Sequence, residues 1–281
     1  MNNILVTGGQ GQLGSELRKI TPNYPDYNFF FTDVKQLDIT NHTAVKEFIE
    51  INNINVIINC AAYTAVDKAE YEPELADAIN HLAAENFAKI AKQNKIKLIH
   101  ISTDYVFDGK NYKPYVETDT PSPRSVYGQT KLDGELAMQH INPENSIIIR
   151  TSWVYSKFGN NFVKTMLRLA ETRNEISVVA DQIGSPTNAG DLAKAILKIL
   201  PKIKNKTVEV FHYSNEGVCS WYDFAKAIFE IKKIDVILNP IESIQFPTTA
   251  KRPYYSMLNK KKIKEKYSLF IPYWRESLLM F

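Results

Sequence analysis

The first twenty residues constrain the fold most strongly, because they combine a strand, a glycine-rich turn and a helix. Residues 3–7 are apolar and partly β-branched, as in a buried strand. Residues 8–14 form a turn with glycines three positions apart, and residues 15–20 then have helical character. A strand that feeds a tight turn and a helix is the repeating unit of a parallel sheet.

The same alternation of strand and helix continues through residue 152. It gives five strand-like segments, at residues 3–7, 28–33, 55–60, 97–102 and 146–152, with helical segments at 43–51, 74–93 and 127–140. This pattern predicts an α/β fold, a Rossmann-type doubly wound parallel sheet with helices on both faces.

The residue composition and the pattern of predicted elements change after Ser152. Residues 153–162 are rich in aromatic and amide side chains, residues 181–187 read as a loop, and residues 208–213 as a strand. Helical patterns cover residues 162–173, 189–200 and 221–231. We expect domains at 1–155 and 156–281, the second a smaller C-terminal lobe that binds substrate. Segments after residue 153 could also return to the main sheet and interleave the two domains.

The glycine-rich turn is a candidate site for a dinucleotide. Glycines let the backbone approach a pyrophosphate, whose charge then sits at the N-terminus of the helix. We assign cofactor binding here to Gly8, Gly11, Gln12, Leu13 and Gly14. The first glycine spacing is three rather than two, and a turn without a ligand is the alternative interpretation.

An acidic residue follows the second predicted strand. Asp33 comes nineteen positions after Gly14, where a carboxylate can accept the ribose hydroxyls of an adenosine. That position favours NADH, whereas Lys35 nearby could meet the 2′-phosphate of NADPH, so both cofactors stay open. Asp38 and Ile39 could flank the adenine. The alternative for Asp33 is an ordinary loop carboxylate.

Small residues follow the third predicted strand. We assign Ala61, Ala62 and the adjacent Tyr63 to the cofactor, since small side chains at the carboxyl end of a strand admit a ligand. Asn80, on the long helix that follows, either bonds a nearby loop or is solvated. His100 lies in the middle of the fourth strand and is interpreted as a sheet histidine.

Tyr127 and Lys131 are the candidate catalytic pair. Residues four apart share one face of a helix, and an ammonium beside a phenol lowers the tyrosine pKa from about 10. Thr103, at the end of the fourth strand, would add a hydroxyl donor. The spacing alone also occurs on amphipathic surface helices, which is the alternative.

Composition excludes several other classes of protein. A net charge of +3 in 281 residues does not favour nucleic acid or a membrane surface, and we interpret the lysines at 260–266 as the solvated face of a late helix. Neither cysteine lies in a CxxC pair, so a zinc site is not predicted. We see no signal peptide and no apolar run of membrane length, and we expect a cytoplasmic protein.

Longer blocks of sequence carry a family resemblance. The segments at residues 7–14, 59–70, 102–109, 150–155 and 181–187, together with Tyr127 and Lys131, resemble the dTDP-4-dehydrorhamnose reductases, a group of extended short-chain dehydrogenases/reductases. The resemblance covers nearly the whole chain and is weakest after Asn205. It implies reduction of the C4 keto group of dTDP-4-dehydro-L-rhamnose by NADPH or NADH, in dTDP-rhamnose biosynthesis.

The resemblance also implies roles for individual residues. Tyr127 would be the acid, Lys131 would lower its pKa and bind the nicotinamide ribose, and Thr103 would bond the keto oxygen. The sugar would lie near Val66, Thr103, Asp104, Tyr105 and Trp153, whose alternative role is packing. Some relatives place acidic residues near the positions of Gly190 and Asp191 for an ion at a dimer contact. A homodimer is thereby suggested, but Mg²⁺ lacks support in the sequence and we assign no metal.

Other functions of the same fold stay open. Another nucleotide-sugar reductase or an epimerase would share the cofactor site, although an epimerase would keep its nicotinamide bound through purification. A non-catalytic regulatory subunit is the alternative from a different class. Such subunits commonly lose the tyrosine or the lysine, and both are present here.

Overall fold

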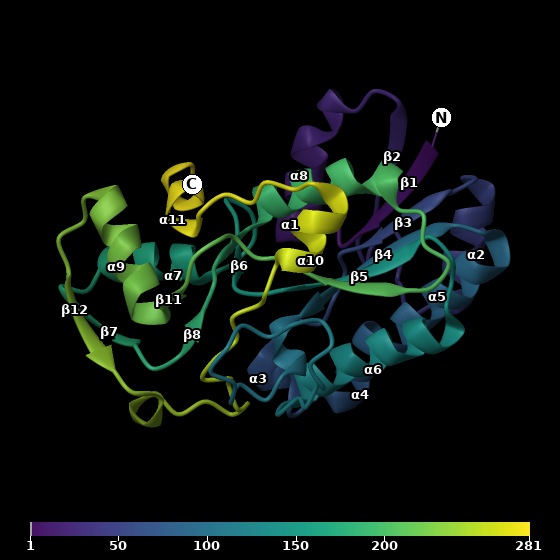
Figure 1. Ribbon diagram of the computed structural model, residues 1–281. Coiled ribbons are helices and arrows are strands. Elements are labelled where there is room, and N and C mark those ends of the chain that lie inside the picture. The colour runs from purple at the N-terminus through teal and green to yellow at the C-terminus, as the bar shows by residue number, and fades with distance from the viewer. Residues whose placement is uncertain (1) are drawn as a thin grey trace.

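The structure, a computed structural model, describes residues 2–281 and contains a six-stranded parallel sheet and a smaller lobe beside it (Figure 1). The strand order is β10-β5-β4-β3-β1-β2, and every pair is parallel. The strands are β1 (Asn2–Thr7), β2 (Tyr27–Phe31), β3 (Val56–Asn59), β4 (Lys97–Thr103), β5 (Ser146–Thr151) and β10 (Glu209–His212). The doubly wound α/β prediction is confirmed, and the order reverses between β1 and β3.

Helices cover both faces of this sheet (Figure 1). One face packs against α1 (Gln12–Ile20), α8 (Ala189–Ile199) and α10 (Lys261–Tyr267), and the other against α2 (His42–Ile51), α5 (Ala83–Asn94) and α6 (Val126–Ile141). Alternate residues of each strand point to opposite faces, so Ile4 and Val6 join the first core and Leu5 joins the second. This two-sided burial explains why the strands are apolar without alternation.

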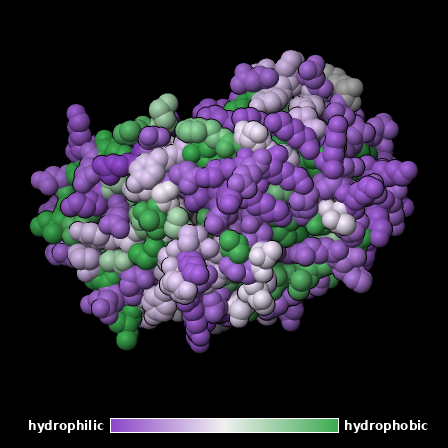
Figure 2. Space-filling view, viewed as in Figure 1, coloured by the Kyte–Doolittle hydropathy of each residue, from purple (hydrophilic) through white to green (hydrophobic). Residues whose placement is uncertain are grey.

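The smaller lobe has a core of its own, which lies beside the sheet in Figure 1. It is built from α7 (Phe162–Ala170), α9 (Trp221–Lys232), α11 (Trp274–Leu279) and the parallel pair β7 (Glu175–Val179) and β12 (Ile237–Ile241). Two short pairs connect to it: β6 (Val154–Tyr155) with β9 (Thr187–Asn188), and β8 (Ile183–Gly184) with β11 (Cys219–Ser220). In the view of Figure 2, hydrophilic side chains dominate the surface and apolar ones are scattered in small groups.

Three elements that follow residue 156 pack on the large sheet rather than in the smaller lobe. Strand β10 pairs with β5, and helices α8 and α10 cover one face. The division at residue 155 stays a prediction. We propose an interleaved division, in which the chain leaves the sheet after β5 and returns to it at α8 and β10.

The structure corrects several local predictions. The helix expected over residues 74–93 is present without a break, but it contains one π turn (Ala78–Leu82) between α4 (Pro73–Asp77) and α5. The second strand ends at Phe31, before Asp33, and the loop at 181–187 contains β8. Lys260 is not solvated: it is 4% exposed and lies 3.6 Å from Glu216. The remaining short elements are α3 (Val66–Ala69) and 3₁₀ turns at Thr21–Asn23, Asp104–Val106, Leu200–Lys202 and Ser243–Gln245.

Candidate active site

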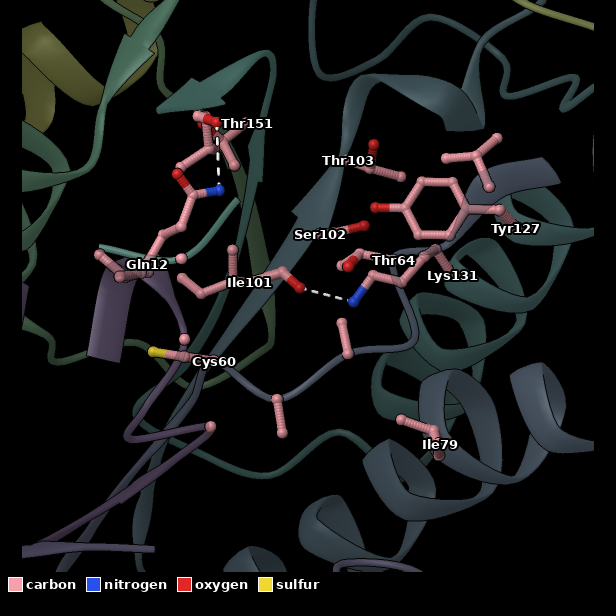
Figure 3. Close-up of a pocket in the computed structure, with 18 of the residues that line it drawn as sticks. Gln12, Cys60, Thr64, Ile79, Ile101, Ser102, Thr103, Tyr127, Lys131 and Thr151 are labelled. Carbon is pink, nitrogen blue, oxygen red and sulfur yellow. Dashed lines mark hydrogen bonds between the residues drawn. The ribbon is translucent and has the colours of Figure 1, made fainter. Parts of the chain in front are cut away.

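A cleft of about 750 Å³ lies at the carboxyl ends of the parallel strands, where open α/β sheets bind their ligands. It takes in the glycine-rich turn and the Tyr127–Lys131 face of α6 (Figure 3). The smaller lobe and its connections contribute one wall, with Trp153, Gly159, Asn160, Trp221 and Arg252. All the predicted site residues line this cleft except Gly14 and Tyr63.

The glycine-rich turn forms the cleft floor before α1. Gly8 has φ +63°, and a Cβ there would lie 2.8 Å from the Ala61 backbone nitrogen, so only glycine fits. A Cβ on Gly14 would lie 2.3 Å from the Gly8 carbonyl oxygen, which shows that Gly14 serves close helix packing rather than the cleft wall. Gly11 precedes the first turn of α1 and is exposed in the cleft. A Cβ on Gly11 would meet only the Gly8 oxygen, at 3.1 Å.

Asp33 lies beside this turn. Its carboxylate accepts a bond from the Gln10 backbone nitrogen at 3.1 Å and one from the Val34 nitrogen at 2.9 Å. These bonds hold the carboxylate at the cleft wall, next to Asp38 and the buried Ile39. Lys35 is exposed and does not line the cleft.

The segment after β3 brings Ala61 and Ala62 into the cleft but turns Tyr63 away. The hydroxyl of Tyr63 donates to Glu72 outside the cleft. The Tyr63 backbone is held on both sides by the buried Asn80 side chain, which accepts from its nitrogen at 2.9 Å and donates to its oxygen at 3.2 Å. Asn80 therefore bonds the loop backbone, and a side-chain contact of Tyr63 with a ligand in the cleft is not supported.

Helix α6 carries the candidate catalytic pair. Ser125 caps the helix by accepting from the Gly128 nitrogen, and this fixes where the first turn begins. Tyr127 is 9% exposed and its hydroxyl points toward Ser102 and Thr103 at the end of β4 (Figure 3). Lys131 is 1% exposed and donates to the Ile101 carbonyl oxygen at 2.6 Å.

The expected direction of the tyrosine pKa is wrong for this geometry. Burial raises the pKa of Tyr127, because desolvation of the phenolate outweighs the opposing interaction with Thr103, and the nearby Asp104 carboxylate acts in the same direction as burial. Burial also lowers the pKa of Lys131 to about 8, although the nearby Glu135 carboxylate partly opposes this shift. Spacing on a helix indicates proximity, but it carries no information on how deeply the pair is buried.

The predicted substrate residues Val66, Thr103, Asp104 and Tyr105 line the same cleft as Tyr127. The Asp104 carboxylate accepts from the Thr103 hydroxyl at 3.1 Å, and burial raises the Asp104 pKa to about 6. Tyr105 packs edge-on against Tyr127, with ring centroids 5.4 Å apart. Val66 begins α3 and packs, like Tyr105, against the apolar cluster that contains Tyr127.

Trp153 is held in an unusual conformation. Its φ of +48° is in the left-handed region, which costs energy for a bulky residue. Its ring stacks on Trp221, with centroids 3.6 Å apart and planes 9° apart. A side chain at Gly184 would collide with the ring, at 2.7 Å. The smaller lobe thereby fixes an indole surface against the cleft.

Sequence reasoning missed Arg252. Its guanidinium lines the cleft and bonds the Tyr105 hydroxyl at 3.0 Å and the Asp67 carboxylate at 2.6 Å. The segment around it has no helical or strand period, so nothing but the Arg252–Pro253 dipeptide marks this position.

Ser102, the neighbour of Thr103 on β4, donates to the buried Glu135.

Within residues 2–281, no three histidine, cysteine, aspartate or glutamate side chains are placed to hold a metal ion. Asp191 instead accepts bonds from Asn215 at 3.0 Å and Ser277 at 2.6 Å, and it lies 3.6 Å from Lys194. These partners hold the Asp191 carboxylate in place.

Comparison with known proteins identifies the family. The model of the RmlD substrate binding domain matches residues 1–281. A dTDP-4-dehydrorhamnose reductase of Aggregatibacter actinomycetemcomitans is 42% identical, over 99% of this chain and 97% of that protein. This chain belongs to the dTDP-4-dehydrorhamnose reductase family.

Solved structures of the dTDP-4-dehydrorhamnose reductase family agree closely with the fold. A crystal structure from Clostridium acetobutylicum is 44% identical, with a TM-score of 0.94 over 99% of this chain and 98% of that one. The Bacillus anthracis reductase, solved in complex with NADP, is 41% identical, with a TM-score of 0.94 over 100% and 99% of the two chains.

Proposed function

We propose that this protein reduces the C4 keto group of dTDP-4-dehydro-L-rhamnose to give dTDP-L-rhamnose, with NADPH or NADH as the reductant. The observation that carries this proposal is the convergence of Tyr127, Lys131 and Thr103 in the same cleft as the glycine-rich turn. The names of the full-length relatives supply the substrate.

The cleft fits a dinucleotide. Gly11 leaves backbone surface open at the N-terminus of α1, where a pyrophosphate would meet backbone N–H groups and the helix dipole, and Gly8 lets the turn pack closely on the Ala61 backbone. Gln12 and Leu13 would flank the pyrophosphate, and Asp33 would accept ribose hydroxyls. Asp38 and Ile39 would border the adenine, and Ala61 and Ala62 would allow the approach of the second nucleotide. Bound there, a reduced nicotinamide supplies the hydride.

Side chains of the protein would donate the proton and stabilise the negative charge that develops on the keto oxygen. As the keto oxygen gains negative charge, the Thr103 hydroxyl would turn from Asp104 to stabilise it, and Tyr127 would donate a proton to it. The high pKa of Tyr127 keeps it protonated before the reaction, as a general acid must be. Lys131, held by the Ile101 carbonyl, provides positive charge beside the phenol and would bond the nicotinamide ribose.

The substrate would lie between the two lobes. Val66, Asp104 and Tyr105 form one side and the Trp153 indole the other, all at the cleft surface. We further propose that Arg252 meets the negatively charged part of the nucleotide sugar, since it is a cation at the cleft wall.

The test is a stopped assay with dTDP-4-dehydro-L-rhamnose and each reduced cofactor, with the product identified by chromatography and mass spectrometry. We expect dTDP-L-rhamnose in stoichiometric amount with the cofactor oxidised. Oxidation without that product, or the C4 epimer as the main product, would point to another nucleotide-sugar reductase.

We also propose a cellular compartment and an oligomeric state for this protein. In residues 2–281 no helix is long and apolar enough to cross a membrane. Cys60 and Cys219 are both free thiols, which supports a reducing compartment, and we propose the cytoplasm. We propose a homodimer on the resemblance alone, and sedimentation of the purified chain would test it.

A further inference from the structure

A buried histidine lies directly behind the ammonium of Lys131. His100, in the middle of β4, is 1% exposed, and its Nε2 atom is 3.4 Å from Lys131 Nζ. Lys131 Nζ also donates to the Ile101 carbonyl. The sequence indicated a sheet histidine, and the proposed roles of Tyr127, Lys131 and Thr103 do not involve His100.

The polar groups behind His100 form a chain of bonds that runs in one direction. The Ala61 nitrogen donates to Thr7 Oγ1 at 3.3 Å, and the Thr7 hydroxyl donates to Asn59 Oδ1 at 2.7 Å. The Asn59 amide nitrogen then lies 3.0 Å from His100 Nδ1. The Thr7 hydroxyl donates to Asn59 Oδ1, so the Asn59 amide nitrogen, which carries hydrogens, faces His100.

This chain of bonds fixes the tautomer of the imidazole. Asn59 donates to Nδ1, so Nδ1 must carry a lone pair, and the ring proton of neutral His100 is on Nε2. Burial, together with the charge of Lys131, holds the pKa of His100 well below its usual range, so the ring stays neutral. An N–H therefore points toward Lys131 Nζ. Such a donor opposes an ammonium and favours a neutral amine.

We propose that His100 is a positioning residue for Lys131, whose Nε2–H stabilises the neutral amine and so lets Lys131 release and recover a proton in each turnover. The proposal deepens the proposed function and rests on it. Tyr127 gives its proton to the sugar oxygen and is then reprotonated by the Lys131 ammonium. The amine that remains is held by His100 and the Ile101 carbonyl until it takes a proton from solvent water.

The other groups that face Lys131 also affect the equilibrium between its ammonium and its neutral amine. Glu135, one turn further along α6, favours the ammonium. Burial raises the pKa of the Cys60 thiol beyond β3 to about 12, so this neighbour stays neutral. Tyr127 lies one turn earlier on the same helix. Burial acts in the opposite sense and prevails. His100 adds to the effect of burial from the β4 side.

The first test measures the tautomer in the wild-type chain. Full-length protein labelled with ¹⁵N-histidine is examined by two-bond ¹H–¹⁵N correlation spectra, and the His100 signals are assigned by their loss in His100→Gln. We expect neutral His100 with its proton on Nε2 from about pH 6 to 9, although a free histidine titrates near 6.5. A proton on Nδ1, or titration within this range, overturns the proposal. The measurement needs no substrate, so it is independent of the proposed reaction.

The second test reverses the chain of bonds. In Asn59→Asp a carboxylate faces Nδ1 and accepts a hydrogen bond from it. The ring proton then lies on Nδ1, and Nε2 becomes an acceptor for the Lys131 ammonium. If Lys131 must carry a proton to reprotonate Tyr127, kcat falls at high pH as Lys131 loses that proton. In Asn59→Asp we expect this fall to occur about one pH unit higher, which is a tenfold change in the proton equilibrium of Lys131. The added charge acts by itself as well, so the same substitution is made in a His100→Met background.

The comparison between the two backgrounds decides the outcome. If Asn59→Asp shifts the pH dependence of kcat clearly less in the His100→Met background, the effect on Lys131 passes through the imidazole, as proposed. Equal shifts in both backgrounds overturn it. Thermal unfolding checks each variant, and if Asn59→Asp does not fold, the tautomer measured in the wild-type chain still supports or overturns the proposal.

Discussion

The guanidinium of Arg252 lies 2.6 Å from the carboxylate of Asp67, which precedes it by 185 residues in the chain. The pair is partly exposed, at 28% and 42% for the two side chains, so screening limits its contribution to stability. Its position matters more, because it ties the C-terminal segment to the wall that carries Val66 and Tyr105.

We therefore expect Arg252→Gln to raise KM for the nucleotide sugar by about ten-fold or more, roughly the effect of losing a charge-assisted bond, with little change in melting temperature. Steady-state kinetics check this. Arg275→Gln, which breaks an exposed pair of similar length with Glu230, is the matched control and should change neither. An unchanged KM in Arg252→Gln would remove this residue from the substrate site.

Tyr127→Phe should leave cofactor affinity nearly intact and lower kcat by ~10²–10⁴-fold, because the phenyl ring keeps the packing but cannot donate a proton. Fluorescence titration with NADPH and single-turnover rates measure the two effects. Tyr63→Phe is the control, since its hydroxyl bonds Glu72 outside the cleft. A Tyr127→Phe enzyme with wild-type turnover would exclude Tyr127 as the acid.

Gly11→Val and Gly14→Ala should fail in different ways. At Gly11 the nearest obstacle is the Gly8 oxygen at 3.1 Å, so the chain should fold and lose cofactor affinity. At Gly14 even a methyl group would be 2.3 Å from that oxygen, so the fold itself should be destabilised. Thermal unfolding and NADPH titration of both variants separate the two. If Gly11→Val binds NADPH normally, the glycine turn does not hold the pyrophosphate.

Asp33→Ala should shift the ratio of kcat/KM for NADPH over NADH upward, because the carboxylate that would repel a 2′-phosphate is gone. Lys35→Ala should shift the ratio downward by a smaller factor, since Lys35 is exposed and does not line the cleft. Kinetics with both cofactors across wild type and the two variants decide the matter. Shifts in the same direction would mean that these residues do not recognise the ribose.

Periodic features could be predicted from the sequence, and features that depend on distant approach could not. The strands, the glycine-rich turn and the cleft at their carboxyl ends follow from local pattern and the rules of parallel sheets. The place of Arg252 does not, because it depends on contact with Asp67 from the other end of the chain. Tyr63 is adjacent to Ala62 in the sequence, yet its side chain leaves the cleft for Glu72.

Burial was the other quantity that the pattern did not contain. The Tyr127–Lys131 spacing predicted a phenol made more acidic, whereas desolvation reverses the direction for Tyr127. The π turn at Ala78–Leu82 was not predicted either. It includes Asn80, whose side chain bonds the Tyr63 backbone, and a contact between such distant residues does not show in the local sequence pattern. The roles of the site residues stay predictions until the variants above are measured.

The return of β10 to the sheet makes the two halves of the chain dependent on each other. Strand β5 is buried along its whole length, and β10 covers its outer edge. A fragment that stops at residue 155 would expose an unpaired apolar edge, which invites pairing with other chains. During synthesis the first half would therefore have to wait for residues 209–212 before β5 has its second neighbouring strand. A nick in the smaller lobe, by contrast, would leave every strand of the sheet with its partners.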